Sequence, residues 1–230
     1  MSNSVGAVIV AAGRGTRMGT VESKQYLLLQ DKPVIVHTLE VFQRHELITE
    51  IVLVTGEADI VRCREWVVAY KLDKVKAVIA GGAERQQSVY KGLQALETDW
   101  VMVHDGVRPF VQAAEISVCY DKAVQTGASV LAVPVKDTIK QVNGAGQVVS
   151  TPDRRSLWAI QTPQTFRLSE LMASYEAAER DGFLGTDDSS LAERSGITVS
   201  VVEGSYSNIK LTTPEDLDFA EFTQRIRGEG

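Results

Sequence analysis

The chain has 230 residues, of which 44% are hydrophobic and 23% are charged, and its formal net charge at pH 7 is −6. A chain of this size and composition can bury the core of one α/β domain. The acidic balance argues against a nucleic-acid partner, which would need a basic face, and the apolar runs are far shorter than the roughly 20 residues that span a bilayer.

The start of the chain and the cysteines indicate the compartment. Residues 1–6 lack the basic start and long apolar core of a signal peptide, so a cytoplasmic location without a membrane partner is expected. Cys63 and Cys119 lie far apart in helical patterns and lack C-x-x-C spacing, which predicts neither a disulfide framework nor a zinc site. Both are expected to be buried packing residues.

Short apolar runs alternate along the chain with amphipathic segments of helical length. The strand-like runs cover residues 6–12, 50–56, 76–82, 100–106, 129–135 and 197–204, and helix-like segments cover residues 34–45, 58–71, 84–97 and 114–127. This alternation predicts a single α/β domain over residues 1–230, with a doubly wound, mostly parallel sheet that has helices on both faces.

Residues 136–158 interrupt the alternation. Two polar strands flank the sequence Asn143-Gly144-Ala145-Gly146, which is a hairpin signal. The strands are too polar for a core pair, so a projecting β-hairpin arm is predicted. An isolated two-stranded hairpin is marginal in water, and we therefore expect the arm, roughly Asp137 to Ser150, to pack on a second subunit.

The loop after the first strand combines glycines with cations. Ligands bind beyond the carboxyl ends of strands in such sheets, where residues 11–26 read AAGRGTRMGTVESKQY. The glycine spacing fits neither the dinucleotide fingerprint nor a P-loop, but glycines let backbone N–H groups approach phosphate oxygens. Arg17 and Lys24 add full charges that can follow charge developing during phosphate transfer. The alternative is a surface turn with solvated cations.

Three later strand ends also carry polar groups. They contain Gly82 and Ser88, which could frame a nucleobase, then Asp105 with Arg108 three residues on, and finally Lys210 before a helix start. Taken singly, each has a structural explanation as a helix start, a turn or ion pair, or a solvated lysine. Because all four loops would converge on one edge of the sheet, together they indicate an anion site.

The order of these motifs resembles a known family. The segments AAGRGTRMG, KQY, GGAERQQSV, VHDGVRPF, DTIK, DRRSLWAIQTPQTF, TDDSSLAE and NIKLTTPEDL closely resemble those of 2-C-methyl-D-erythritol 4-phosphate cytidylyltransferases of the non-mevalonate isoprenoid pathway. The resemblance covers nearly the whole chain. It implies a Rossmann-like nucleotidyltransferase in which methylerythritol phosphate attacks the α-phosphorus of CTP and releases pyrophosphate, with Mg²⁺ as cofactor.

Carried over residue by residue, the resemblance implies individual roles. Arg17 and Lys24 match the catalytic cations that stabilise the pentavalent α-phosphate, and Arg154 and Lys210 match the catalytic positions that align the attacking phosphate. Nucleotide-binding positions are matched by Ala11, Ala12, Gly13, Gly82, Ser88 and Asp105. Positions that bind the sugar substrate are matched by Asp105, Arg108, Thr138 and Thr162. Mg²⁺ is expected to be held mainly by CTP phosphates, with at most Asp105 as a protein ligand.

The resemblance also implies a homodimer with exchanged arms, in which Thr138 and Arg154 reach the partner's site. Two alternatives stay open from the residues: a ribitol 5-phosphate cytidylyltransferase with the same loops, and a non-catalytic nucleotide-binding domain on the same fold. The presence of both Arg17 and Lys24 argues against the second.

The three histidines are expected to be structural. The nucleophile would be a phosphate oxygen that is already ionised at neutral pH, so no general base is required. His37 and His45 lie in a helical pattern and His104 lies near a strand end, none of them at metal-ligand spacing.

Overall fold

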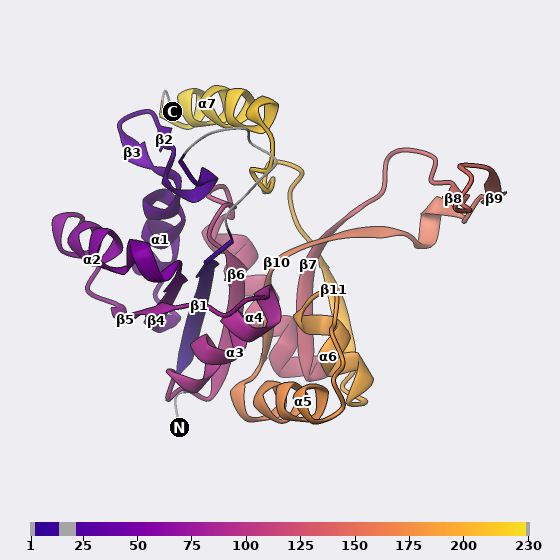
Figure 1. The fold of residues 1–230 in the computed structure, drawn as a ribbon, viewed down its shortest axis with the longest axis horizontal. Helices are drawn as coiled ribbons and strands as arrows, with labels where there is room; N and C mark the ends of the chain where they lie inside the picture. The colour runs from indigo at the N-terminus through magenta and orange to yellow at the C-terminus, as the bar shows by residue number, and fades with distance from the viewer. Residues whose placement is uncertain (1–2, 14–21, 229–230) are drawn as a thin grey trace.

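The computed structural model describes residues 3–13 and 22–228 and is built around one large sheet (Figure 1). The strands stand in the order β11-β7-β10-β6-β1-β4-β5. Their bounds are β1 (Val5–Ala11), β4 (Ile48–Thr55), β5 (Val75–Ala80), β6 (Trp100–Asp105), β7 (Ala128–Pro134), β10 (Trp158–Arg167) and β11 (Val199–Glu203). The helices are α1 (Val34–Arg44), α2 (Ile60–Ala69), α3 (Arg85–Gln94), α4 (Ala113–Thr126), α5 (Leu168–Arg180), α6 (Asp188–Arg194) and α7 (Pro214–Gly228).

Helices cover both faces of the sheet because its strands are apolar on both sides. In β1, Val5, Ala7 and Ile9 belong to an apolar cluster with residues of α1, α2 and α4, whereas Val8 packs with residues of α3, α5 and α6. β1 pairs in parallel with both β4 and β6. Parallel strands buried on both faces are typical of doubly wound folds, and the predicted fold class is confirmed.

The predicted strands and helices correspond to β1, β4, β5, β6, β7, β11 and α1 to α4, but β10 was missed as a strand. β10 runs antiparallel to both neighbours, β6 and β7, in the interior of the sheet. Its sequence is polar, and Gln161, Thr162, Gln164 and Thr165 are all buried. These side chains are hydrogen-bonded within the domain, so they do not show the apolar pattern that identifies a core strand.

The predicted arm leaves the domain between β7 and β10 and projects to one side (Figure 1). Its strands β8 (Gln141–Val142) and β9 (Val148–Ser150) are antiparallel. The turn between them is closed by a hydrogen bond from Gly146 N to Asn143 O at 2.9 Å, and Gly146 has a φ of 77° that favours glycine. The arm therefore has the predicted hairpin turn with shorter strands than the sequence suggested.

A third apolar cluster includes a residue of α7, the helix that lies beyond the carboxyl end of β1 (Figure 1). It joins Leu211 and Ala220 to Phe110 in the loop after β6 and to Leu29 in the small sheet of β2 (Leu28–Leu29) and β3 (Lys32–Pro33). This cluster fixes the segment before α7 above the sheet edge.

Both cysteines are buried inside the domain. Cys63 on α2 and Cys119 on α4 are buried free thiols, which confirms their predicted packing role. Among residues 3–13 and 22–228, no helix combines the length and apolar character that crossing a membrane requires.

Candidate active site

A pocket of about 170 Å³ opens at the carboxyl ends of β1, β5 and β6. Most of the site residues predicted from the sequence line it, namely Ala11, Ala12, Gly13, Lys24, Gly82, Ser88, Asp105 and Lys210. Arg17 lies outside the described residues. The structure thus brings together the loops that the sequence suggested would converge on one sheet edge.

The loop after β1 is held in place by the buried side chain of Gln25, a role that no sequence pattern indicates. Its buried side-chain amide donates hydrogen bonds to the carbonyl oxygens of Ala11 at 2.8 Å and Gly13 at 3.1 Å. Gln25 belongs to a 3₁₀ turn, Lys24–Tyr26, so these bonds also fix the backbone that presents Lys24 to the pocket. The position of this lysine is therefore set by a buried neighbour.

The loop after β5 closes tightly onto the first loop. A Cβ at Gly81 would lie 2.4 Å from the Cβ of Ala12, so a larger residue could not occupy this position without displacement. The Ser88 hydroxyl accepts the Gly82 N–H at 3.0 Å and donates to the Glu84 carbonyl at 3.0 Å. With its proton committed, Ser88 has only acceptor capacity left for a ligand.

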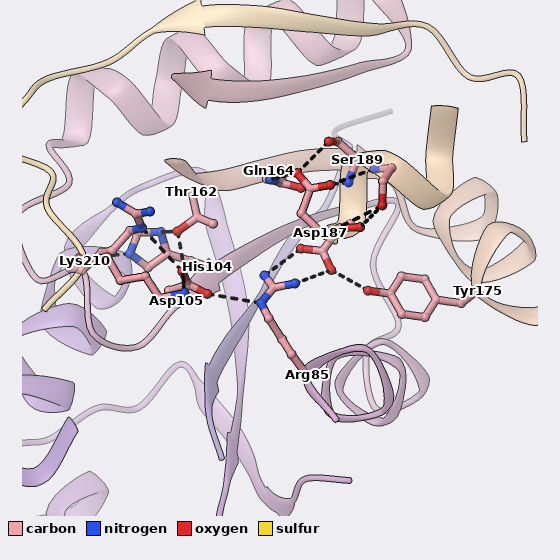
Figure 2. A network of polar contacts seen from close by, with 12 residues as sticks. Arg85, His104, Asp105, Thr162, Gln164, Tyr175, Asp187, Ser189 and Lys210 are labelled. Atoms are coloured by element: carbon pink, nitrogen blue, oxygen red, sulfur yellow. Dashed lines mark hydrogen bonds and ion pairs between the residues drawn. The ribbon is translucent and has the colours of Figure 1, made fainter. Parts of the chain in front are cut away.

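Asp105 is the electrostatic centre of the site. Asp105 is buried, with 6% of its surface exposed. Its carboxylate lies 2.9 Å from Lys210 Nζ, 3.4 Å from Arg85 Nε and 3.5 Å from Arg108 Nε (Figure 2). Burial alone would raise the pKa of Asp105, but the charges of Arg85, Lys210 and Arg108 outweigh it and hold the pKa well below the usual range. The carboxylate is therefore ionised.

A buried hydrogen-bond chain fixes the backbone on which Asp105 stands. The Asp105 N–H donates to Thr162 Oγ1 at 3.1 Å, Thr162 Oγ1 lies 3.0 Å from His104 Nδ1, and His104 Nε2 lies 3.0 Å from the carbonyl oxygen of Arg108. A carbonyl only accepts, so Nε2 carries the proton and Nδ1 accepts from the threonine. Because burial lowers the pKa of His104 to about 4, the ring is neutral at pH 7.

Arg85, at the start of α3, lies in the GGAERQQSV segment, and the sequence alone assigns it no role. Its guanidinium makes two hydrogen bonds to Asp188 on α6, at 3.0 and 2.8 Å, and lines the pocket beside Asp105. Burial would lower the pKa of Arg85, yet the charges of Asp188 and Asp105 raise it. Asp188 belongs to the TDDSSLAE segment, and nothing in that segment indicates a pairing with Arg85.

Two predicted substrate contacts lie behind Asp105 and do not line the pocket. Arg108 is 9% exposed and donates from Nη1 to the Asn208 carbonyl at 2.7 Å. The Thr162 hydroxyl is engaged with His104 and the Asp105 N–H. In this arrangement both residues support Asp105, and their contact with a substrate stays a prediction.

The remaining predicted residues, Thr138 and Arg154, are exposed on the arm and do not line the pocket. Arg154 donates from Nη1 to the Lys136 carbonyl at 2.7 Å, within the arm itself. Since the arm projects away from the domain (Figure 1), one chain does not place these two side chains at its own pocket.

The oxygen ligands at the pocket fit a metal ion that is bound mainly by the phosphates of a ligand. Within the described part of the chain there is no cluster of three or more His, Cys, Asp or Glu side chains able to hold a metal. Asp105 offers carboxylate oxygens at the pocket, but three cations already compensate its charge. Mg²⁺ keeps several non-protein ligands in many sites, so these residues fit an ion bound mainly by a nucleotide.

Comparisons with known proteins agree with this geometry. The family model described as 2-C-methyl-D-erythritol 4-phosphate cytidylyltransferase matches residues 5–225. The proteins of that name from Geobacillus kaustophilus and Alkaliphilus metalliredigens are 53% identical over 216 residues and 47% identical over 234 residues. The first match covers 94% of each chain, and the second covers 100% of this chain and 97% of the relative.

A solved structure also matches this chain in fold. The 4-diphosphocytidyl-2C-methyl-D-erythritol synthase of Anaerococcus prevotii superposes with a TM-score of 0.85 at 33% sequence identity, and the match covers 97% of each chain.

The buried neutral His104 predicts a specific pH dependence of stability. Its pKa is about 4 in the folded protein, against an ordinary value of 6.5. The unfolded chain therefore binds the proton first, so this contribution is complete above pH 6.5 and is lost as the pH falls toward 4. The loss is up to about 1.4 kcal/mol per pH unit and about 3 kcal/mol in all.

Urea unfolding of wild type and His104→Asn between pH 7 and 4 measures this contribution. We expect the wild-type free energy of unfolding to fall more steeply than that of the variant, because the carboxylates that also titrate are common to both. Parallel curves would show that His104 is not buried in its neutral form.

Proposed function

Because the chain belongs to the 2-C-methyl-D-erythritol 4-phosphate cytidylyltransferase family, a family of nucleotidyltransferases of isoprenoid biosynthesis, we propose that its pocket binds CTP and methylerythritol phosphate and joins them into the CDP-alcohol, releasing pyrophosphate. The observation that carries the assignment is the convergence of Lys24, Arg85 and Lys210 on one pocket beside an ionised Asp105. The relatives are named for methylerythritol phosphate, and neither ribitol phosphate transfer nor a non-catalytic role is favoured.

The chemistry needs positioning and charge. The attacking phosphate oxygen is ionised at neutral pH, so the protein supplies cations for the charge that develops on the α-phosphate. Lys24 at the pocket wall is proposed to stabilise that charge, together with Arg17, which lies outside the described residues. Lys210 is proposed to align the attacking phosphate, and its ion pair with Asp105 holds the ammonium group in place before substrate arrives.

Mg²⁺ belongs to the same proposal. It would be carried by the CTP phosphates, with Asp105 as the residue able to contact it, and when bound it would neutralise charge on the pyrophosphate leaving group. We also place the enzyme in the cytoplasm, where the free thiols of Cys63 and Cys119 would stay reduced.

The loop after β5 is proposed to select the base. Ser88 Oγ donates its proton to Glu84 O and accepts from Gly82 N. It can therefore accept a further hydrogen bond from the 4-amino group of cytosine but cannot donate to the 4-carbonyl of uracil. The same loop is proposed to leave too little room beside Gly82 and Ser88 for a purine.

The reaction and its selectivity can be tested together by pyrophosphate release from purified protein with Mg²⁺. We expect release with CTP and methylerythritol phosphate, and a kcat/KM for UTP or ATP that is lower by roughly 5- to 150-fold, because an unpaired polar group in the pocket costs about 1–3 kcal/mol. Ribitol 5-phosphate serves as the alternative acceptor. Comparable turnover of ribitol phosphate, or of UTP, would contradict the proposed substrates.

The arm is proposed to complete the site of a second subunit in a homodimer. Its exposed aliphatic side chains include Val142, Val148 and Val149, which a hairpin this small cannot bury by itself. Thr138 and Arg154 belong to the same arm and do not line the pocket of their own chain. Exchange of arms would cover the valines and bring these residues to the partner's bound substrate.

Mixing two damaged proteins tests whether Arg154 acts across the dimer. Lys24→Ala and Arg154→Ala should each lose about 10²–10³ in kcat, because each lacks one charge that acts on the reacting phosphates. After reversible dissociation and mixing, half of the dimers pair one subunit of each kind, and each such dimer holds one intact site. We expect about a quarter of wild-type activity.

Mass-tagged subunits control for exchange in this experiment. If mixed dimers form and no activity returns, Arg154 serves the site of its own chain and the exchanged-arm proposal is wrong. A mixture of Lys24→Ala with tagged Lys24→Ala is the matched control and should stay inactive.

A further inference from the structure

A fully buried carboxylate outside the pocket is paired with one of the cations that line the pocket. Asp188, on α6, has no exposed surface and is not among the residues that line the pocket. Its oxygens accept both Nη groups of Arg85, at 3.0 and 2.8 Å, and Oδ1 also accepts the Tyr175 hydroxyl at 2.5 Å. Burial and the charge of Asp188 raise the pKa of Tyr175, which therefore stays protonated and donates.

The position of Asp188 is itself fixed by β10. Asp187 accepts the Ser190 N–H at 3.0 Å at the start of α6 and accepts the Gln164 side-chain amide at 2.9 Å. Gln164 Oε1 in turn accepts the Ser189 N–H at 2.9 Å. Figure 2 shows these polar groups side by side, with Arg85 between Asp105 on one side and Tyr175 on the other. The start of α6 is thus tied to the strand next to β6.

In this arrangement the N–H groups of Arg85 are shared between two carboxylates, those of Asp188 and Asp105. Both Nη groups are directed at Asp188, so only Nε, at 3.4 Å, approaches Asp105 Oδ1. Asp105 Oδ2 pairs with Lys210 at 2.9 Å and, at the longer distance of 3.5 Å, with Arg108 Nε. A guanidinium released from Asp188 could form the favoured two-bond pair with Asp105. It would then compete with Lys210 for the carboxylate.

We propose that Asp188, held by Tyr175, is a positioning residue that orients Arg85 and so keeps Asp105 available to Lys210. Asp188 contacts no substrate in this proposal and acts only through the guanidinium. The inference rests on the proposed function for its kinetic consequence, because Lys210 is assigned to the attacking phosphate. The orientation of Arg85 can be measured without turnover.

Asp188→Asn tests the proposal directly. We expect kcat/KM for methylerythritol phosphate to fall on the order of tenfold, as is common when a partner that orients a functional group is lost, with a smaller change in KM for CTP. Independently, the Nε–Hε NMR signal of Arg85, assigned by its absence in Arg85→Lys, should shift strongly in Asp188→Asn. Asp181→Asn is the matched control, because the exposed Asp181–Arg194 pair joins the end of α5 to α6 away from the pocket.

A milder variant keeps the test decisive if Asp188→Asn does not fold. Tyr175→Phe removes one hydrogen bond but retains the ring stacked on Tyr90, with centroids 5.8 Å apart. We expect a loss of a few-fold in the same kinetic constant and a shift of the Arg85 signal. Tyr90→Phe, which removes a hydroxyl from the same ring pair without touching Asp188, should change neither.

Two results would overturn the proposal. One is an unchanged Arg85 signal in a folded Asp188→Asn or Tyr175→Phe protein, which rejects positioning whether or not the enzyme turns over. The other is a shifted signal with kcat/KM for methylerythritol phosphate unchanged. If the wild-type protein transfers no cytidylyl group, the proposed function fails, while the NMR signal still reports separately on the control of Arg85.

Discussion

The ionised carboxylate of Asp105 at the end of β6 is the constraint on which the site depends. A charge with so little exposure costs several kcal/mol to bury unless opposite charges compensate it. The compensating cations come from three separate segments: Arg85 begins α3, Arg108 lies in the loop after β6, and Lys210 precedes α7. The ion pairs that compensate the charge of Asp105 therefore join three parts of the chain at the same edge of the sheet.

Buried neighbouring residues hold each of these charged side chains in position. Lys210 is held because the adjacent Leu211 is buried in the apolar cluster under α7 and its N–H donates to the Val107 carbonyl at 3.0 Å. Asp105 is held by the chain through Thr162 and His104, and Arg85 is held by Asp188. Cations fixed in this way need little reorganisation when a triphosphate binds, which is how preorganised sites stabilise developing charge.

Sequence patterns were informative where a local rule applied. Apolar runs and helical periodicity identified six sheet strands and four helices, and the rule that ligands bind at the carboxyl ends of strands brought Gly82, Asp105 and Lys210 together. β10 was missed because its buried face is polar and satisfied by hydrogen bonds. The Arg85–Asp188 pair joins residues 103 positions apart, and no local pattern encodes such a contact. Arg17, outside the described residues, and the reach of Arg154, which depends on a second subunit, stay predictions.

The ionisation of Asp105 at acid pH tests this account most directly. A ¹³C NMR titration of the side-chain carboxyl carbons, with Asp105 assigned by its absence in Asp105→Asn, follows the group without substrate or turnover. The account predicts that Asp105 stays ionised as the pH is lowered, down to the acid limit of the folded state. A midpoint near the ordinary aspartate value of about 3.9 would show that the three cations do not hold this carboxylate, and would contradict the central role given to it.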